Sequence, residues 1–152
     1  MVKMERGGHI IFMCAANVIR SPMAAAIFAY KMQARSFNCR VESAGVMDLG
    51  YSTGAAPQWK QVSMAEQFDL SSHRSRHISR VPYEATTFFV CADRDVAHKV
   101  RDLKGVDQDR VLILNGVHGV EDPVHNPTVQ GFKDCFTQIY TGVDKLIEIL
   151  IE

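Results

Sequence analysis

Apolar and polar positions alternate in blocks along the chain, and their order predicts a sheet covered by helices. Short apolar or alternating segments predict strands at residues 10–13, 39–43, 86–91 and 110–114. Longer segments with helical periodicity predict helices over residues 21–34, 57–67 and 128–151, and another that begins after Ala92. Strands that alternate with helices favour a parallel sheet with helices on both faces, a three-layer α/β/α fold. Ligands of such folds bind beyond the carboxyl ends of the strands.

The segment from Ile10 to Met23 combines a buried strand, a short loop and the start of a helix. Cys14 begins the loop and Arg20 ends it. The backbone N–H groups of the loop and the positive end of the helix can therefore converge in front of the cysteine sulfur. A site of this kind suits a phosphate-like dianion.

The residue types in this loop are those of a nucleophilic site. Helix N-termini and nearby cations stabilise thiolates, so Cys14 is expected to act as a nucleophile. The planar guanidinium of Arg20 can hold two oxygens of a phosphoryl group and follow them into the transition state. Ser21 can donate a hydrogen bond to the thiolate, and Asn17 tolerates the left-handed backbone that a tight anion loop often needs. The alternatives are a buried core cysteine and a surface ion pair for the arginine.

The segment resembles the phosphate-binding loop of the low-molecular-weight protein tyrosine phosphatases. The resemblance implies a flavodoxin-like fold with a four-stranded parallel sheet. The family usually has Gly in place of Ala16 and a second Cys in place of Ile19, so a protective disulfide within the loop is not available here. The residues that the resemblance assigns to phosphate binding are Ala15, Ala16, Asn17, Val18, Ile19 and Ser21.

Three further positions resemble the family, and the resemblance implies supporting roles for them. Ser43, in Ser-Ala-Gly, is expected to hold Asn17 through hydrogen bonds. His73, in Ser-His-Arg, is expected to reach the loop and orient Asn17. Asp93 follows the third predicted strand and is expected to lie near the loop or to cap a helix. The alternatives are a strand-end serine, a solvated histidine and a simple N-cap.

Asp122-Pro123, in a turn-rich loop before the last helix, is the second signature of the resemblance. Expulsion of a tyrosyl oxygen requires a proton, which a carboxylic acid on a loop can donate and later recover from water. Asp122 is therefore the expected general acid. Asp-Pro is also a common turn former, which is the alternative interpretation.

The resemblance places two positions of the substrate cleft at Leu49 and Val124, where the family commonly has aromatic residues. An aromatic substrate would lose stacking there, and a different leaving-group preference is expected. A group of basic residues could attract an acidic protein substrate or form only a solvated face. Its members are Arg74, Arg76, His77 and Arg80.

Composition restricts the remaining classes of function. The 152 residues include 17 basic and 17 acidic ones, so no overall charge directs the chain to nucleic acid or to a membrane surface. Four widely spaced cysteines favour reduced thiols in the cytoplasm, and they suggest no metal site. No apolar run is long enough for a membrane span. With 47% hydrophobic residues, a single domain over residues 1–152 is expected.

The resulting prediction is a cysteine-dependent phosphatase that needs no metal or organic cofactor. Cys14 attacks phosphorus, Arg20 and the loop amides stabilise the charge, Asp122 protonates the leaving oxygen, and water cleaves the phosphocysteine. By the resemblance, Val18 favours phosphotyrosine on protein, because the related arginine phosphatases have Thr there. A small phosphomonoester is the other substrate class. Inorganic phosphate or another oxyanion is expected in the loop. The formation of a homo-oligomer is left open by the sequence.

Two alternatives stay open as well. An arsenate reductase would use the same loop but needs a relay of further cysteines, and Ile19 removes the neighbouring candidate. A non-catalytic module that binds phosphate or phosphopeptides would fit the departures at Ala16 and Ile19. Arsenate-dependent thiol oxidation would identify the first, and phosphopeptide binding without turnover would identify the second.

Overall fold

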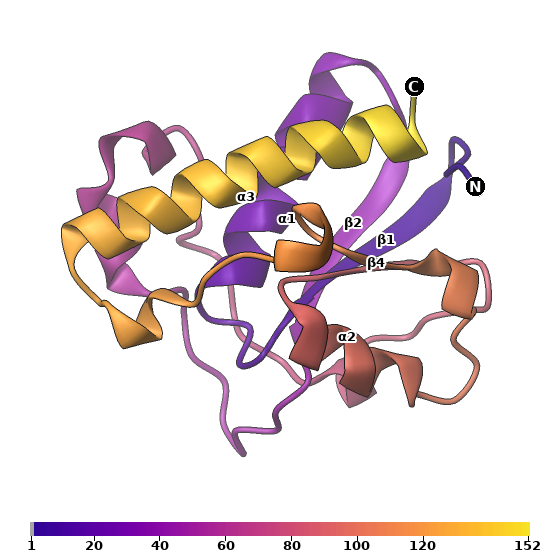
Figure 1. Ribbon diagram of the computed structural model, residues 1–152, viewed down its shortest axis with the longest axis horizontal. Helices are drawn as coiled ribbons and strands as arrows, with labels where there is room; N and C mark the ends of the chain where they lie inside the picture. The colour runs from indigo at the N-terminus through magenta and orange to yellow at the C-terminus, as the bar shows by residue number, and fades with distance from the viewer. Residues whose placement is uncertain (1) are drawn as a thin grey trace.

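Parallel strands form the centre of the molecule, and the computed structural model describes residues 2–152 (Figure 1). The strands lie in the order β2-β1-β3-β4, and every neighbouring pair is parallel. Their bounds are Gly8–Cys14 for β1, Cys39–Gly45 for β2, Phe88–Cys91 for β3 and Val111–Ile113 for β4. The predicted four-stranded parallel sheet is confirmed.

The alternating direction of the side chains along β1 explains why the apolar segment at residues 10–13 contains no polar residue. Ile10 and Phe12 belong to one hydrophobic core, and Ile11 and Met13 belong to the other. None of the four is more than 1% exposed. Because successive side chains of a strand point to opposite faces, a strand covered on both sides needs an apolar residue at every position.

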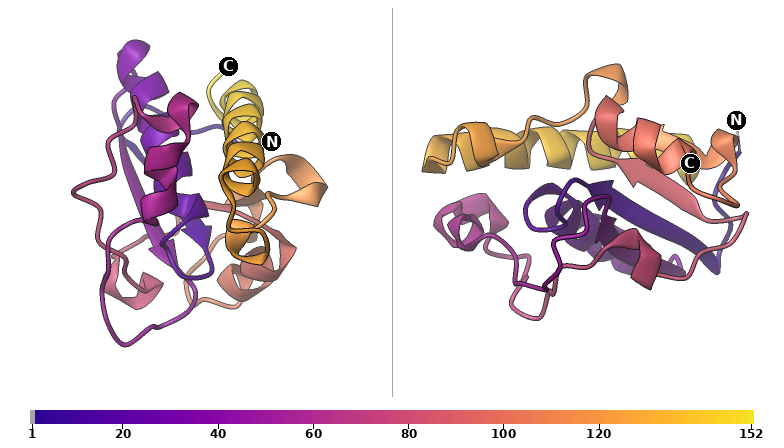
Figure 2. Two further views of the ribbon diagram at one scale, coloured as in Figure 1. Left: turned by 90° about the vertical axis from the view of Figure 1, so that its left-hand side faces the viewer. Right: turned by 90° about the horizontal axis from the view of Figure 1, so that it is seen from below.

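Residues 2–152 contain three α-helices, which are α1 (Arg20–Ala34), α2 (Arg94–Arg101) and α3 (Val129–Leu150). α1 and α3 pack on each other and share the core that contains Phe12, while α2 packs on β3 and β4 in the core that contains Met13. Figure 2 shows α3, in yellow, running along one side of the molecule. Within the described part of the chain, no helix combines the length and the apolar character needed to cross a membrane. The three-layer α/β/α fold is confirmed.

The helix predicted over residues 57–67 is wrong. Two short 3₁₀-helices, Pro57–Gln61 and Ser63–Ala65, occupy the segment, and Val62 between them has an extended backbone. Every third residue from Trp59 to Ala65 is buried. A spacing of three matches the period of a 3₁₀-helix, so this conformation keeps the apolar residues on one side, where an α-helix would rotate them away.

The other predicted elements are present with shifted ends. β1 and β2 are longer than predicted because they pair along their whole length, from Gly8 opposite Cys39 to Cys14 opposite Gly45. The last helix begins after Thr128, whose hydroxyl caps it by accepting a hydrogen bond from the N–H of Gly131 at 3.0 Å.

The carboxyl ends of the strands bring the loop that follows β1 against the end of β2. A Cβ on Gly45 would lie 2.8 Å from the carbonyl oxygen of Ala15, so only glycine lets the loop approach this closely. The segment after β4 returns to the same edge, where the N–H of Val120 donates to the carbonyl of Ala92 at 2.7 Å. The expected ligand position is therefore surrounded by chain from several strands.

Two cysteines of the core should resist thiol reagents in the folded protein. Cys91 and Cys135 are buried, and burial raises the pKa of each thiol to about 12. An alkylating agent at neutral pH should modify neither residue until a denaturant is added, as peptide mass spectrometry can show. Half-buried Cys39 provides the internal comparison, and rapid modification of Cys91 in the native protein would contradict this packing.

Candidate active site

The loop from Cys14 to Arg20 is held from outside through its carbonyl groups. Three backbone N–H groups and two side chains donate to five of these carbonyls, at distances between 2.8 and 3.1 Å. The donors and acceptors are Val46 N to Cys14 O, Met47 N to Ala15 O, His73 Nε2 to Asn17 O, Ala56 N to Val18 O and Trp59 Nε1 to Ile19 O.

This outward attachment decides where the N–H groups of the loop point. In a planar trans peptide, the C=O of one residue and the N–H of the next point in opposite directions. Since the five carbonyls face outward, the N–H groups that follow them face the inside of the loop. The N–H of Asn17, which follows none of these five carbonyls, donates to the sulfur of Cys14 at 3.3 Å. The loop is therefore lined with donors, as a site for a tetrahedral oxyanion requires.

Asn17 fixes the shape of the loop from its centre. Its φ of 61° is left-handed, as the sequence predicted, and its side chain is completely buried. Its Nδ2 donates to the hydroxyls of Ser21 at 2.8 Å and Ser43 at 2.9 Å, and its Oδ1 accepts from the N–H of Arg76 at 3.0 Å. Ala16 has a negative φ, so its Cβ introduces no left-handed strain at this position.

Ser21 is oriented to donate to the Cys14 sulfur. The Ser21 oxygen and the sulfur are 3.0 Å apart. Because Asn17 Nδ2 already donates to this oxygen, the hydroxyl hydrogen is free to point at the sulfur. Cys14, only 3% exposed, thus receives hydrogen bonds from a hydroxyl and from a backbone N–H, and both stabilise a thiolate.

His73 reaches the loop as its resemblance implied, but through the backbone of Asn17. Its Nε2 lies 2.8 Å from the Asn17 carbonyl, which can only accept, so the ring carries a proton on Nε2. Burial lowers the pKa of His73, the hydrogen bond to Asn17 opposes the shift, and the charges of Arg76 and Arg74 add to it. The neutral imidazole is therefore the form that holds the loop.

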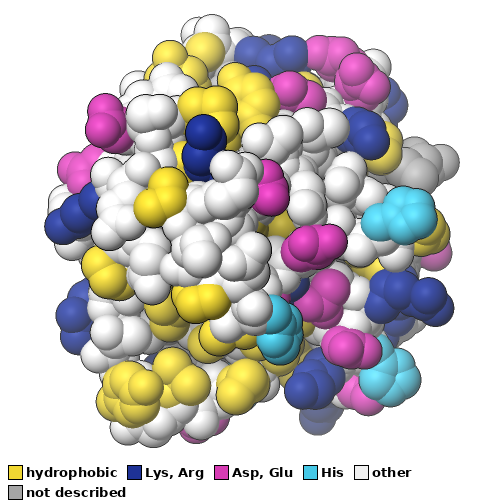
Figure 3. Space-filling model, turned by 60° about the vertical axis from the view of Figure 1, so that its left-hand side comes forward, with side chains coloured by type: hydrophobic (Ala, Val, Ile, Leu, Met, Phe, Trp, Pro, Cys, Tyr) yellow, Lys and Arg dark blue, Asp and Glu magenta, His cyan; other side chains and the backbone are white. Residues whose placement is uncertain are grey.

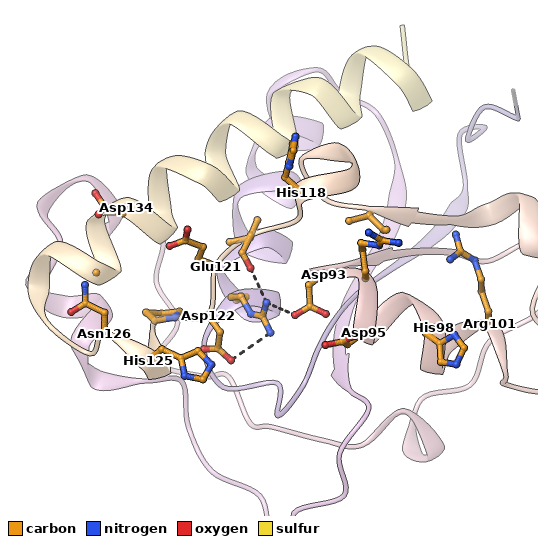
Figure 4. Close-up of a pocket in the computed structure, with 16 residues that line it drawn as sticks. Asp93, Asp95, His98, Arg101, His118, Glu121, Asp122, His125, Asn126 and Asp134 are labelled. Carbon is orange, nitrogen blue, oxygen red and sulfur yellow. Dashed lines mark hydrogen bonds and ion pairs between the residues drawn. The ribbon is translucent and has the colours of Figure 1, made fainter.

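Arg20 begins α1 and is nearly fully buried against two other segments, which carry the Asp93 and Asp122 labelled in Figure 4. Its Nη1 donates to Asp93 Oδ2 at 2.7 Å and to the carbonyl of Val120 at 2.8 Å. Its Nη2 lies 3.5 Å from Asp122 Oδ2. The guanidinium has five N–H donors, so it retains free donors for a ligand in the loop.

Asp93 connects Arg20 to the start of α2. One carboxylate oxygen accepts from Arg20, and the other caps the helix by accepting from the N–H of Val96 at 2.8 Å. Burial alone raises the pKa of Asp93, but these hydrogen bonds and the charge of Arg20 outweigh burial and bring it below the usual value. Both roles weighed for Asp93 in the sequence, near the loop and as an N-cap, are present in the structure.

Asp122 is held at the edge of the site by its own turn. Its Oδ1 caps the 3₁₀-helix Pro123–His125 by accepting from Val124 N at 3.0 Å. The carboxylate thereby lies beside the guanidinium of Arg20. The sequence-predicted nucleophile, arginine and acid are brought to one end of the sheet.

A cleft of about 930 Å³ opens beside Arg20 and Asp122. Figure 3 shows acidic and histidine side chains gathered on one part of the molecular face. His125 lines the cleft, whereas Val124 does not and is 59% exposed. Leu49 is half-buried and lines a smaller pocket on the other side of the loop, together with Ala16.

In residues 2–152, no group of three or more His, Cys, Asp or Glu side chains is arranged to hold a metal ion.

The sequence did not reveal what holds the loop from outside. Trp59 packs edge-on against Phe132, with ring centroids 4.9 Å apart. Its indole N–H also holds the carbonyl of Ile19. The N–H groups of Val46, Met47 and Ala56 carry no sequence signal, because every residue except proline has one.

Trp59→Phe should weaken binding of inorganic phosphate to the loop by about two- to tenfold, the worth of one hydrogen bond. The change removes the donor to Ile19 and lets this peptide group rotate. Titration calorimetry measures the affinity, and Phe132→Leu is the matched control, since it disturbs the same packing and keeps the indole N–H. Equal weakening in both variants would contradict the role of the hydrogen bond.

The lowered pKa of His73 predicts a pH dependence of stability. The unfolded chain takes up the proton first, so the free energy of unfolding should fall as pH drops below the usual histidine value of 6.5 and through the lower folded value. His73→Gln, whose amide can still donate to Asn17, should reduce this dependence in denaturant unfolding at neutral and mildly acidic pH. The exposed His118, changed to Gln, is the control. An unaltered pH dependence in His73→Gln would contradict the assignment.

Comparison with known proteins identifies the family. A sequence model described as "Low molecular weight phosphotyrosine protein phosphatase" matches residues 9–152. Low molecular weight protein-tyrosine phosphatase A of Mycobacterium tuberculosis is 30% identical over 148 residues, covering 91% of this chain and 88% of the relative. The human low molecular weight phosphotyrosine protein phosphatase is 30% identical over 102 residues, covering 62% of this chain and 63% of the relative.

Solved structures show the same fold at lower sequence identity. A low molecular weight protein tyrosine phosphatase from T. tengcongensis has a TM-score of 0.78 at 23% identity, covering 94% of this chain and 99% of that one. A YwlE mutant from Bacillus subtilis has a TM-score of 0.82 at 23% identity, covering 95% and 99%. From the family match and the relatives, this chain belongs to the low-molecular-weight phosphotyrosine protein phosphatase family.

Proposed function

We propose that the chain hydrolyses phosphotyrosine and other phosphomonoesters in two steps, through a phosphocysteine on Cys14. The observation that carries the proposal is the position of the sulfur inside a loop whose N–H groups face inward, with Arg20 and Asp122 at its edge. Membership of the phosphatase family supports it. The same features support a single phosphatase domain over residues 1–152.

In the first step, the Cys14 thiolate attacks phosphorus and an S–P bond forms as the bond to the leaving oxygen breaks. The inward N–H groups hold the phosphoryl oxygens, and the free donors of Arg20 bind the charge that spreads over them in the transition state. Asp93 and the Val120 carbonyl keep the guanidinium in place, so little reorganisation is needed when substrate binds. Ser21 donates to the sulfur and stabilises the thiolate before attack.

Asp122 supplies the proton that the leaving oxygen needs. Its protonated carboxyl group donates to that oxygen, and the carboxylate that results then removes a proton from the water that attacks phosphocysteine. The second step returns the Cys14 thiolate and releases inorganic phosphate. Inorganic phosphate and similar oxyanions should therefore compete with substrate for the loop.

By the family resemblance, Leu49 and Val124 stand where aromatic residues commonly flank the substrate. An aryl group therefore loses stacking there, and the leaving-group preference should differ from that of the family. For the arsenate reductase alternative, the buried Cys91 and Cys135 are poorly placed for a relay, because a thiol of the relay must exchange with an accessible partner.

Four reduced cysteines are in keeping with a cytoplasmic location, which forms part of the proposal.

Hydrolysis of p-nitrophenyl phosphate without added metal tests the nucleophile. Cys14→Ser should abolish turnover, because a serine hydroxyl in this loop has no adjacent base to activate it. Cys39→Ser, which removes a half-buried thiol away from the loop, should keep the wild-type rate. A wild type that binds phosphate without turning over substrate would contradict the proposal and favour a binding module.

A comparison of two leaving groups tests whether Asp122 is the general acid. Asp122→Ala should lower kcat by about 10²- to 10⁴-fold with phenyl phosphate and by less with p-nitrophenyl phosphate, whose leaving oxygen needs a proton less. Asp134→Ala is the matched control, because Asp134 lines the same cleft but is paired with Gln130 rather than Arg20. Equal losses with both leaving groups would show that Asp122 is not the acid.

A further inference from the structure

A second, smaller pocket adjoins the anion loop on the β2 side of β1, whereas the large cleft is lined by segments that follow β3 and β4, on the other side of β1. Its volume is about 130 Å³, below the roughly 300 Å³ at which small-molecule sites begin. Ala16 of the loop forms one wall, and the segments 47–52 and 75–77 with Arg80 form the others. A pocket of this size beside the phosphate site has room for one side chain of a bound peptide.

The charged groups of this pocket are mostly basic, and two of them are available. The lining contains Asp48, Arg76, His77 and Arg80. Arg76 is engaged by the Ser43 carbonyl and Glu42, and Asp48 accepts from the N–H of Gly50. In residues 2–152, the exposed Arg80 has no ion pair or side-chain hydrogen bond, so its guanidinium can meet a ligand.

His77 adds a second donor at the same pocket. Its Nδ1 accepts a hydrogen bond from the N–H of Ser79, so the ring proton lies on Nε2. This nitrogen has no partner in the described part of the chain. An N–H donor and a guanidinium at one small pocket match the oxygens of a carboxylate.

The opposite side of the loop has the reverse charge. Five carboxylates and three arginines line the large cleft. The carboxylates are Asp93, Asp95, Glu121, Asp122 and Asp134, all of which are labelled in Figure 4. An acidic side chain of a substrate bound at Cys14 would be repelled there and attracted toward Arg80.

From this asymmetry we propose that the pocket between residues 47–52 and Arg80 binds an acidic side chain next to the phosphorylated residue of a peptide substrate. The inference rests on the proposed function, because it takes the phosphate to lie in the Cys14 loop. Exposed Met47 and Tyr51 give apolar contact to the backbone or the aliphatic stem of that side chain. The substrate class is therefore an acidic phosphotyrosine peptide.

Phosphotyrosine peptides that differ only by Glu or Gln, placed in turn at each position next to the phosphotyrosine, test the subsite. For at least one position, kcat/KM of the wild type should favour Glu by about two- to fivefold, as expected for one exposed ion pair. Arg80→Gln should bring this ratio to about one, and Arg80→Glu should reverse it. Added salt should also reduce the ratio, because exposed charges are screened.

Arg101→Gln is the matched control, since Arg101 lines the large cleft and should keep the wild-type ratio. The absence of a Glu preference at every position, or a ratio unchanged by Arg80→Gln, would overturn the subsite. Binding of the same peptides to Cys14→Ser, followed by fluorescence anisotropy, separates the two proposals. A Glu preference in binding that depends on Arg80 supports the subsite, whether or not the wild type hydrolyses the peptides. Failure of the wild type to hydrolyse any phosphate ester would overturn only the proposed function.

Discussion

The outward hydrogen bonds of the loop carbonyls are the constraint on which the rest of the site depends. A short loop with free peptide groups would turn some carbonyls toward the ligand and repel an anion. Here five carbonyls are satisfied from outside, so the peptide geometry alone places five N–H groups inside. The inward direction of these N–H groups is thus set by the groups that hold the carbonyls from outside, and not by the side chains of Ala15, Ala16, Val18 and Ile19.

The groups around the loop and Arg20 come from distant parts of the chain, and the parallel sheet brings many of them together. Val46 and Met47 follow β2, Asp93 follows β3, and Val120 and Asp122 follow β4. All of these strands end at the same edge as β1, where Cys14 lies. The hydrophobic cores on both faces of the sheet support this edge, which carries the loop, the arginine and the acid.

Much of this arrangement could be predicted from the sequence, because it rests on strong local patterns. The loop and its nucleophile and arginine were predicted from the apolar strand before Cys14 and the helix that begins at Ser21-Pro22. The acid was predicted from Asp122-Pro123. The prediction of one helix over residues 57–67 was wrong, because Pro57 indicated a helix start while the three-residue spacing of the buried residues suits the two 3₁₀-helices found there. The contacts of Trp59 and the backbone donors could not be predicted, since they depend on tertiary packing that leaves no residue-type signal.

Capture of the covalent intermediate tests the two-step mechanism most directly. Wild-type protein is mixed with p-nitrophenyl phosphate, stopped in acid within the first turnover and digested for mass spectrometry. We expect phosphate on the sulfur of Cys14 and on no other residue. Hydrolysis that proceeds without any phosphorylated Cys14, or with phosphate on another side chain, would contradict it.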